Sequence, residues 1–144
     1  MAAIKGTARL LVLAGAAKPS PAIGQALGPL GVNMMEFCKD FNARTTTYKP
    51  SALMRVKLTA FDDRTFKFKI LTPPTSWYLK RVTGIEKGAK SPGKETVSTV
   101  SCKAIYEIAK SKQQFDPDMK NFELEGLAKS IVATAKSMGI KVVR

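Results

Sequence analysis

The segment from Met54 to Thr75, MRVKLTAFDDRTFKFKILTPPT, shows how this chain is organised. Apolar and polar residues alternate twice in it, which is the pattern of strands with one buried face. Asp62-Asp63-Arg64 separates the two runs and predicts a turn between antiparallel strands. One face of the predicted hairpin is apolar and the other cationic. The apolar positions are Met54, Val56, Leu58, Phe66, Phe68 and Ile70, and the cationic positions are Arg55, Lys57, Lys67 and Lys69.

The same segment ends in Thr72-Pro73-Pro74-Thr75, which predicts a domain boundary. Two adjacent prolines cannot continue a strand, and they favour an extended, semi-rigid connection. We therefore expect an N-terminal domain at residues 1–71, a hinge at residues 72–75 and a C-terminal domain at residues 76–144. Because the whole chain has 144 residues, each domain is close to the lower size limit for a self-sufficient core.

Upstream of the hairpin, the pattern predicts a third strand and two helices. Thr7 to Leu13 is short and apolar, and it leads into the stiff, exposed Pro19-Ser20-Pro21 segment. Ile23 to Leu30 can form a short helix, and Asn33 can cap a longer one. The buried stripe of the longer helix is predicted to contain Met34, Phe37, Cys38 and Phe41. We expect an α+β fold whose N-terminal domain is a small, mostly antiparallel sheet with helices.

The C-terminal domain is predicted to be all helical, apart from a possible extended piece from Thr96 to Val100. A loop from Ile85 to Lys94 has hardly any apolar anchors, and we expect it to be mobile without a ligand. The predicted helices run from Thr75 or Ser76 to Val82, from Ser101 to about Lys112, and from near Asn121 to Gly139.

Charge is the strongest feature of the composition. Lys and Arg number 24 against 11 acidic residues, so the formal net charge is +13. Residues 1–72 contribute +7 and residues 73–144 contribute +6, so no detached tail explains the excess. Such a field attracts a polyanion. No apolar run approaches the roughly 18 residues of a membrane-spanning helix, and we expect nucleic acid as the partner and no membrane.

The chain has few residues suited to catalysis. It contains no histidine, which removes the commonest general base and metal ligand. The Gly24 to Gly31 stretch is followed by Val32 and Asn33, whereas a phosphate-binding P-loop needs Lys and Ser or Thr there. Cys38 and Cys102 are too far apart in sequence for a zinc or redox motif, and we expect both to be reduced and buried. We predict no enzyme, no metal site and no cofactor.

The last helix predicts a binding surface. Its apolar arc faces the core, and its opposite arc consists of small residues bordered by Lys129 and Lys136. Such a face can approach a nucleic-acid backbone closely, which suits the shallow minor groove of A-form RNA. Packing against another protein helix also favours small residues, and the helix alone leaves both interpretations open. The core arc is Leu124, Leu127, Ala128, Ile131, Val132, Ala135 and Met138, and the small arc is Gly126, Ser130, Ala133 and Ser137.

The surrounding charge favours RNA over a protein helix, because each phosphate neutralised adds to affinity. Five cations lie in the short helix and the loop of the same domain, with only Glu86 among them. Trp77 and Tyr78 could stack on unpaired bases, but their helical spacing beside Leu79 and Val82 favours core positions. The expected RNA contacts are Lys80, Arg81, Lys87, Gly88, Lys90, Ser91, Lys94, Gly126, Lys129, Ser130, Ala133, Thr134, Lys136, Ser137, Met138 and Gly139.

Several longer runs together resemble the ribosomal protein L-eleven family of the large subunit, as found in bacteria and organelles. The resemblance spans nearly the whole chain, and its specificity comes from the combination of runs. They are Lys18-Pro-Ser-Pro-Ala-Ile-Gly-Gln-Ala-Leu-Gly28, Gly31-Val-Asn-Met-Met-Glu-Phe-Cys-Lys-Asp-Phe-Asn-Ala-Arg44, Asp63-Arg-Thr-Phe-Lys-Phe68, Thr72-Pro-Pro74, Leu79-Lys-Arg81, Gly84-Ile85, Ser130-Ile131 and Ala133-Thr-Ala-Lys-Ser-Met-Gly139.

The resemblance implies a C-terminal domain that holds a folded segment of large-subunit ribosomal RNA. It also implies an N-terminal domain that swings on the Pro-Pro hinge near the stalk, with stalk-base ribosomal proteins and translational GTPase factors as partners. In the family the proline-rich loop faces the cleft between protein and RNA. Ala22 and Gln25 stand where the family usually has proline, which bears on the loop's stiffness and on sensitivity to cleft-binding antibiotics. The corresponding factor-facing residues here are Pro19, Ser20, Pro21, Ala22 and Gln25.

Other runs look more like mitochondrial members of the family than bacterial ones. We therefore expect a structural protein of the mitochondrial large subunit that helps form the GTPase-associated region. A bacterial-type cytoplasmic or plastid ribosome is the alternative location, and a helical protein-interaction adaptor is the alternative function. The runs are Tyr48-Lys-Pro50, Ser76-Trp-Tyr78, Gly84-Ile-Glu-Lys-Gly-Ala89, Tyr106-Glu-Ile-Ala109 and Gly139-Ile-Lys-Val-Val-Arg144.

Overall fold

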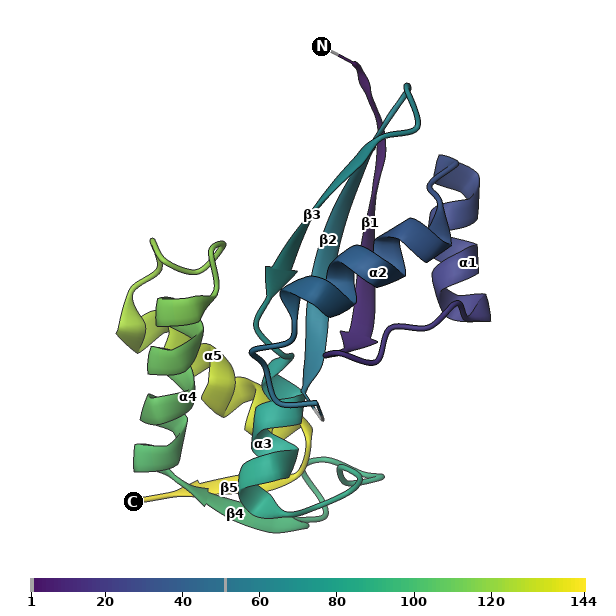
Figure 1. The fold of residues 1–144 in the computed structure, drawn as a ribbon. Coiled ribbons are helices and arrows are strands. Elements are labelled where there is room, and N and C mark those ends of the chain that lie inside the picture. The colour runs from purple at the N-terminus through teal and green to yellow at the C-terminus, as the bar shows by residue number, and fades with distance from the viewer. Residues whose placement is uncertain (1, 51) are drawn as a thin grey trace. The chain divides into compact units, whose positions relative to one another are not determined.

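A computed structural model of the chain describes residues 2–50 and 52–144 (Figure 1). The chain divides into two compact units, which meet between Leu71 and Thr72. The first unit contains an antiparallel sheet with helices, and the second contains helices with a small parallel sheet. The predicted α+β class is therefore confirmed. Among the described residues, no helix is long and apolar enough to cross a membrane.

The sheet of the first unit has the strand order β1-β2-β3, and both neighbouring pairs are antiparallel. Alternate residues of the central strand are buried, as the sequence pattern predicts. In the predicted turn, Asp63 accepts hydrogen bonds from the amide and the hydroxyl of Thr65, and these bonds lower the pKa of Asp63. The strands are β1 (Ile4–Leu13), β2 (Leu53–Phe61) and β3 (Phe66–Leu71).

Two helices and a 3₁₀ turn lie on one side of this sheet (Figure 1). The Asn33 side chain caps the longer helix by accepting a hydrogen bond from the Met35 amide at 3.1 Å, as predicted. Phe37 is fully buried and packs edge-on against Phe68, with ring centroids 5.4 Å apart. The elements are α1 (Pro21–Leu27), η1 (Gly28–Leu30) and α2 (Met34–Arg44).

The second unit is not all helical, which corrects the sequence-based prediction. β4 and β5 form a two-stranded parallel sheet that pairs Ser98–Ser101 with Ile140–Val143. The possible extended piece at Thr96 to Val100 overlaps β4, but β5 was not anticipated. The elements of this unit are α3 (Thr75–Thr83), β4 (Ser98–Ser101), α4 (Cys102–Phe115), α5 (Leu124–Ser137) and β5 (Ile140–Val143).

One apolar core joins all these elements of the second unit. Tyr78 packs against this core, as predicted. Val132 belongs to the predicted core arc of α5 but is 38% exposed, because it lies at the margin of the arc. The buried members are Leu79, Val100, Ile105, Ile108, Ala109, Leu127, Ile131, Ala135 and Ile140.

Both cysteines are free, but only one of them is buried. Cys38 lies on the buried side of α2, and burial raises the pKa of its thiol. Cys102 is exposed, so the prediction that both are buried is wrong for this residue. Cys102 opens α4 directly after the cap residue Ser101, and the buried side of that helix begins only at Ile105.

Candidate nucleic-acid interface

The outer face of α5 carries only small side chains and is exposed. Leu127, Ile131 and Ala135 fix the helix to the core through its opposite side. Gly126 has open space around it, since an added Cβ atom would meet nothing within 4 Å. The four small residues of the predicted arc, Gly126, Ser130, Ala133 and Ser137, are all exposed.

The hydroxyl groups on this helix lie flat against its backbone. Ser130 Oγ donates to the Leu127 carbonyl at 2.7 Å, and Ser137 Oγ donates to the Thr134 carbonyl at 2.6 Å. Thr134 Oγ1 donates in the same way to the Ser130 carbonyl at 3.0 Å. Because each proton is used within the helix, the hydroxyl oxygens are left to accept hydrogen bonds. The face therefore offers acceptors suited to the 2′-hydroxyl groups of RNA.

Two lysines border this face. Lys129 forms an ion pair with Glu125 one turn earlier, at 3.0 Å, and both side chains are largely exposed. An exposed pair of this kind contributes only about 0.3–0.5 kcal/mol, so a phosphate can replace Glu125 at little cost. Lys136 is exposed in the last turn of α5.

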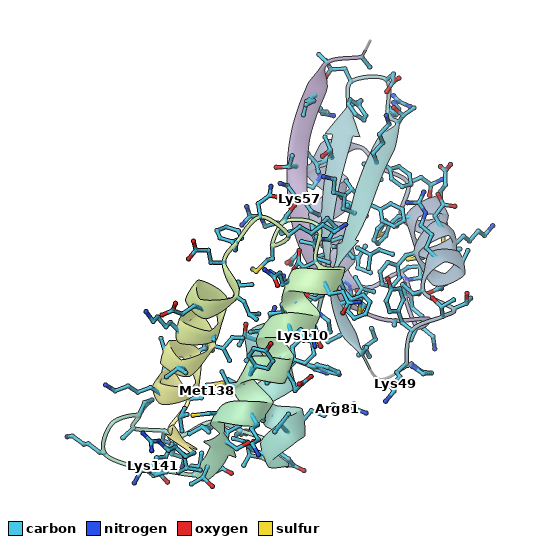
Figure 2. The ribbon with its side chains drawn as sticks, turned by 90° about the vertical axis from the view of Figure 1, so that its left-hand side faces the viewer. Lys49, Lys57, Arg81, Lys110, Met138 and Lys141 are labelled. Atoms are coloured by element: carbon cyan, nitrogen blue, oxygen red, sulfur yellow. The ribbon has the colours of Figure 1, made fainter. Side chains whose placement is uncertain are left out.

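The basic loop is fastened to the C-terminal end of α5. The Ala89 amide donates to the Met138 carbonyl at 2.9 Å, and the Val97 amide donates to the Gly139 carbonyl at 2.9 Å. Gly88 also lies against this end, since an added Cβ atom would be 3.3 Å from the Met138 carbonyl oxygen. Gly88 and Ala89 are thus the two residues docked on α5, and Lys87 and Lys90 flank them in sequence. The docking brings both lysines to the helix end that is labelled by Met138 in Figure 2.

Gly139 serves a packing role within this arrangement. It is buried and has φ +78°, and an added Cβ atom would be 2.4 Å from the Ala89 Cβ atom. Only glycine allows both the left-handed turn after α5 and the close approach of the loop. Gly139 was predicted as an RNA contact, and the structure shows it buried where the loop meets the end of α5.

Arg81 of α3 lies apart from this helix end. Lys80 is half-buried and Arg81 is exposed, and the Arg81 guanidinium lies 5.2 Å from the centre of the half-buried Trp77 ring. In Figure 2, Arg81 and Met138 are on different sides of the unit. The structure therefore joins the loop and α5 into one surface but does not bring Arg81 to the end of α5. The remaining predicted contacts Ser91 and Lys94 are exposed in the loop.

Comparison with known proteins yields two matching family models. The model described as "Ribosomal protein L11, N-terminal domain" matches residues 8–66, and the one described as "Ribosomal protein L11, RNA binding domain" matches residues 71–142. The chain belongs to the ribosomal protein L11 family. This confirms the resemblance seen in the sequence, and because the family is structural, the prediction of a protein without enzymatic activity is confirmed as well.

A curated relative supports the mitochondrial assignment. The chain is 48% identical over 135 residues to "Large ribosomal subunit protein uL11m" of Schizosaccharomyces pombe. The match covers 94% of this chain and 93% of the relative. This relative is the mitochondrial form, in agreement with the sequence-based prediction.

The proline-rich loop of this L11 family member is held at both ends. Asn42 accepts from the Ala17 amide at 2.9 Å and donates to the Ala17 carbonyl at 3.1 Å, which fixes the start of the loop. Ser20 caps α1 by accepting a hydrogen bond from the Ile23 amide. The other four residues of the predicted set, Pro19, Pro21, Ala22 and Gln25, are exposed.

Two charged residues that sequence reasoning missed fix the start of the second unit. Lys112 and Asp116 are both buried. The Thr72 hydroxyl donates to the Asp116 carboxylate at 2.8 Å, and the Lys112 ammonium donates to the Pro73 carbonyl at 3.0 Å. A signal was present, because Lys112 follows Ile108 and Ala109 at helical spacing and therefore lies on the buried side of α4.

Proposed function

We propose that this chain is a structural component of the mitochondrial large ribosomal subunit, and that α5 and the loop fastened to it bind large-subunit ribosomal RNA. The observation that carries the proposal is the low outer face of α5, with Ala133 at its centre and lysines only at its borders. A long side chain at the centre would keep a nucleic-acid backbone away. Small residues let the helix approach the shallow minor groove of an A-form duplex.

The loop extends this proposed surface with charge. Lys87 and Lys90 flank the two residues that dock on α5 and are exposed beside the helix end. Their ammonium groups can bind phosphates while the helix face contacts sugars. Contacts to sugar and phosphate hold a protein in position on RNA, so this unit would recognise the shape of the RNA more than its sequence.

We further propose that the first unit faces the stalk-base proteins and the translational GTPase factors. The proposal rests on four exposed residues: Pro19 lies between the Asn42 anchor and the cap of α1, and Pro21, Ala22 and Gln25 lie on α1 itself. An anchored loop that leads into a capped helix presents these residues in one conformation, which lowers the entropic cost of binding.

The test compares two variants of the full chain in binding to a folded fragment of large-subunit ribosomal RNA with magnesium at low salt. Ala133→Arg adds a positive charge, so simple attraction would strengthen binding. We expect it instead to weaken binding by about tenfold or more, equivalent to about 1.4 kcal/mol. Lys136→Ala should have a smaller effect, because it removes one border contact and leaves the centre of the face intact.

Ala43→Arg is the matched control, since Ala43 is an exposed alanine on a helix of the first unit. It adds the same bulk and charge away from α5, and we expect no loss of affinity. If Ala133→Arg and Lys136→Ala weakened binding equally, close docking of α5 would be wrong. If RNA did not bind, and a purified protein bound independently of salt, the helical adaptor would be the better interpretation.

A further inference from the structure

The sheet of the first unit has an open face that the proposed RNA contact on α5 does not use. Alternate residues of β1, β2 and β3 pack under α1 and α2, and the residues between them point to the other side. In register, Arg9 lies opposite Lys57, and Lys57 lies opposite Lys69. One row across the sheet therefore consists of three cations, and Figure 2 shows Lys57 on the side away from α2.

The neighbouring row continues the pattern. Thr7 lies opposite Thr59, and Thr59 lies opposite Lys67. Arg9, Lys67 and Lys69 are exposed, and Lys57 on the central strand is half-buried. The three strands contain no Asp or Glu.

This arrangement costs stability. Like charges directly opposite each other on neighbouring strands repel, whereas opposite charges there attract. Solubility alone does not require such rows, because alternating signs would solvate the sheet equally well. A ligand that carries negative charge would offset the repulsion.

We propose that this cationic sheet face, formed by Arg9, Lys57, Lys67 and Lys69 with Thr7 and Thr59, is a second RNA-binding surface that takes a sugar-phosphate backbone. Lys67 and Lys69 are two residues apart on one strand, a spacing of roughly 7 Å, and neighbouring strands are about 4.8 Å apart. These spacings let one extended strand of phosphates contact several cations at once. Threonine hydroxyls next to the cations supply the other common type of contact to phosphate and sugar.

An acidic protein segment is the competing ligand. Leu11 and Leu13 are 58% and 46% exposed on the same face, and aliphatic side chains of a protein could pack on them. They lie at one end of β1, however, beyond the two rows of cations and hydroxyls. The central rows have the composition of a surface that binds a nucleic-acid backbone, and this favours RNA.

The experiment titrates the isotope-labelled full chain with oligouridylate, an unstructured RNA, at low salt and follows the backbone amide signals by NMR. We expect shifts in β1, β2 and β3 around Arg9, Lys57 and Lys69. The double variant Lys57→Gln/Lys69→Gln should weaken RNA binding at these amides by about tenfold. Its salt dependence should fall by about 1.4 in log-log slope, because each phosphate contact on a single strand contributes about 0.7.

The matched control is Lys39→Gln/Lys49→Gln, which removes the same charge from exposed lysines elsewhere in the first unit. We expect it to change the affinity at the sheet by less than about twofold. The amide spectrum of each variant also reports whether its fold is intact. If Lys57→Gln/Lys69→Gln disturbed the fold, Arg9→Gln, which changes one exposed residue of an edge strand, would take its place.

Three results would overturn the proposal. The sheet amides could fail to shift with RNA, or both double variants could weaken binding equally, which would indicate diffuse attraction to a chain of net charge +13. Polyglutamate could also shift the same amides at lower concentrations than oligouridylate, which would identify a surface for acidic protein. The contact on α5 is tested separately with the folded ribosomal RNA fragment, so failure of the sheet surface is distinguishable from failure of the proposed contact on α5.

Discussion

At the scale of single residues, Gly139 controls the docking of the basic loop. Gly84 has nearly the same backbone conformation, φ +75° against +78° for Gly139, but an added Cβ atom at Gly84 would meet nothing within 4 Å. A substitution at Gly84 would therefore introduce backbone strain alone, whereas the same substitution at Gly139 would introduce both strain and steric overlap. At Gly139 the overlap would be with Ala89, whose amide holds the loop to α5.

We predict that Gly139→Ala destabilises the second unit more than Gly84→Ala does. The left-handed conformation costs a non-glycine residue about 1–2 kcal/mol, which both variants share. Overpacking against Ala89 should add about 1–3 kcal/mol for Gly139→Ala alone. Urea unfolding measures the difference in the free energy of unfolding. Equal losses in the two variants would mean that the loop moves aside without cost.

Single residues were also the least predictable from the sequence. Cys102 and Lys112 lie in the same predicted helix. Residue type alone would predict a buried cysteine and an exposed lysine, but Cys102 is exposed and Lys112 is buried. Cysteine is among the most buried residue types and lysine is almost never buried without a partner. Lys112 is buried because its ammonium group reaches the Pro73 carbonyl, and no local pattern reveals a partner 39 residues away.

At the scale of elements, the start of the second unit is set by buried polar contacts and not by the prolines alone. Thr72 and Pro73 are buried and bonded to Asp116 and Lys112 of the second unit. Both were predicted as hinge residues. We propose that the pivot is narrower than residues 72–75 and lies at the bonds between Leu71 and Thr72.

We predict that Asp116→Ala lowers the free energy of unfolding of the second unit by about 1–3 kcal/mol, because it removes the carboxylate that accepts the hydrogen bond of the buried Thr72 hydroxyl. NMR relaxation should then show larger motion of the Thr72 amide. Asp118→Ala is the control, since Asp118 is exposed in the same turn, and its effect should stay within about 0.5 kcal/mol. An unchanged Thr72 amide in Asp116→Ala would contradict the narrow pivot.

Elements with a clear period were predictable, and the short parallel sheet was not. Alternation identified β2 and β3, and helical spacing identified α2, α4 and α5, because each pattern repeats several times within its element. β5 has only four residues and pairs with β4, some 40 residues earlier in the chain. A strand of that length offers too few repeats of any period, and its partner is set by packing around Ile140 in the core. Similarly, the α5 face was predictable from small residues, but the docking of Gly88 and Ala89 on Met138 depends on three-dimensional proximity.

At the scale of the whole molecule, positive charge is divided almost equally between two units with separate cores. Leu58 is fully buried in the first unit, and Ile131 is nearly so in the second. The proposed RNA contacts have the same division, with one surface on α5 and the other on the sheet. An RNA that occupied only one surface would stabilise only the unit that carries it, since a ligand stabilises the structure to which it binds.

We predict that the two units respond separately to core substitutions. Ile131→Ala should cost about 2–5 kcal/mol in the second unit, and Leu58→Ala should cost a similar amount in the first. Hydrogen exchange should then show reduced protection of α5 amides in Ile131→Ala with unchanged protection of β2 amides, and the reverse in Leu58→Ala. A folded ribosomal RNA fragment bound through α5 should restore protection to the second unit of Ile131→Ala and leave the first unit of Leu58→Ala unprotected. Loss of protection in both units after either substitution would show that they unfold as one cooperative structure, and the division of labour between them would then be wrong.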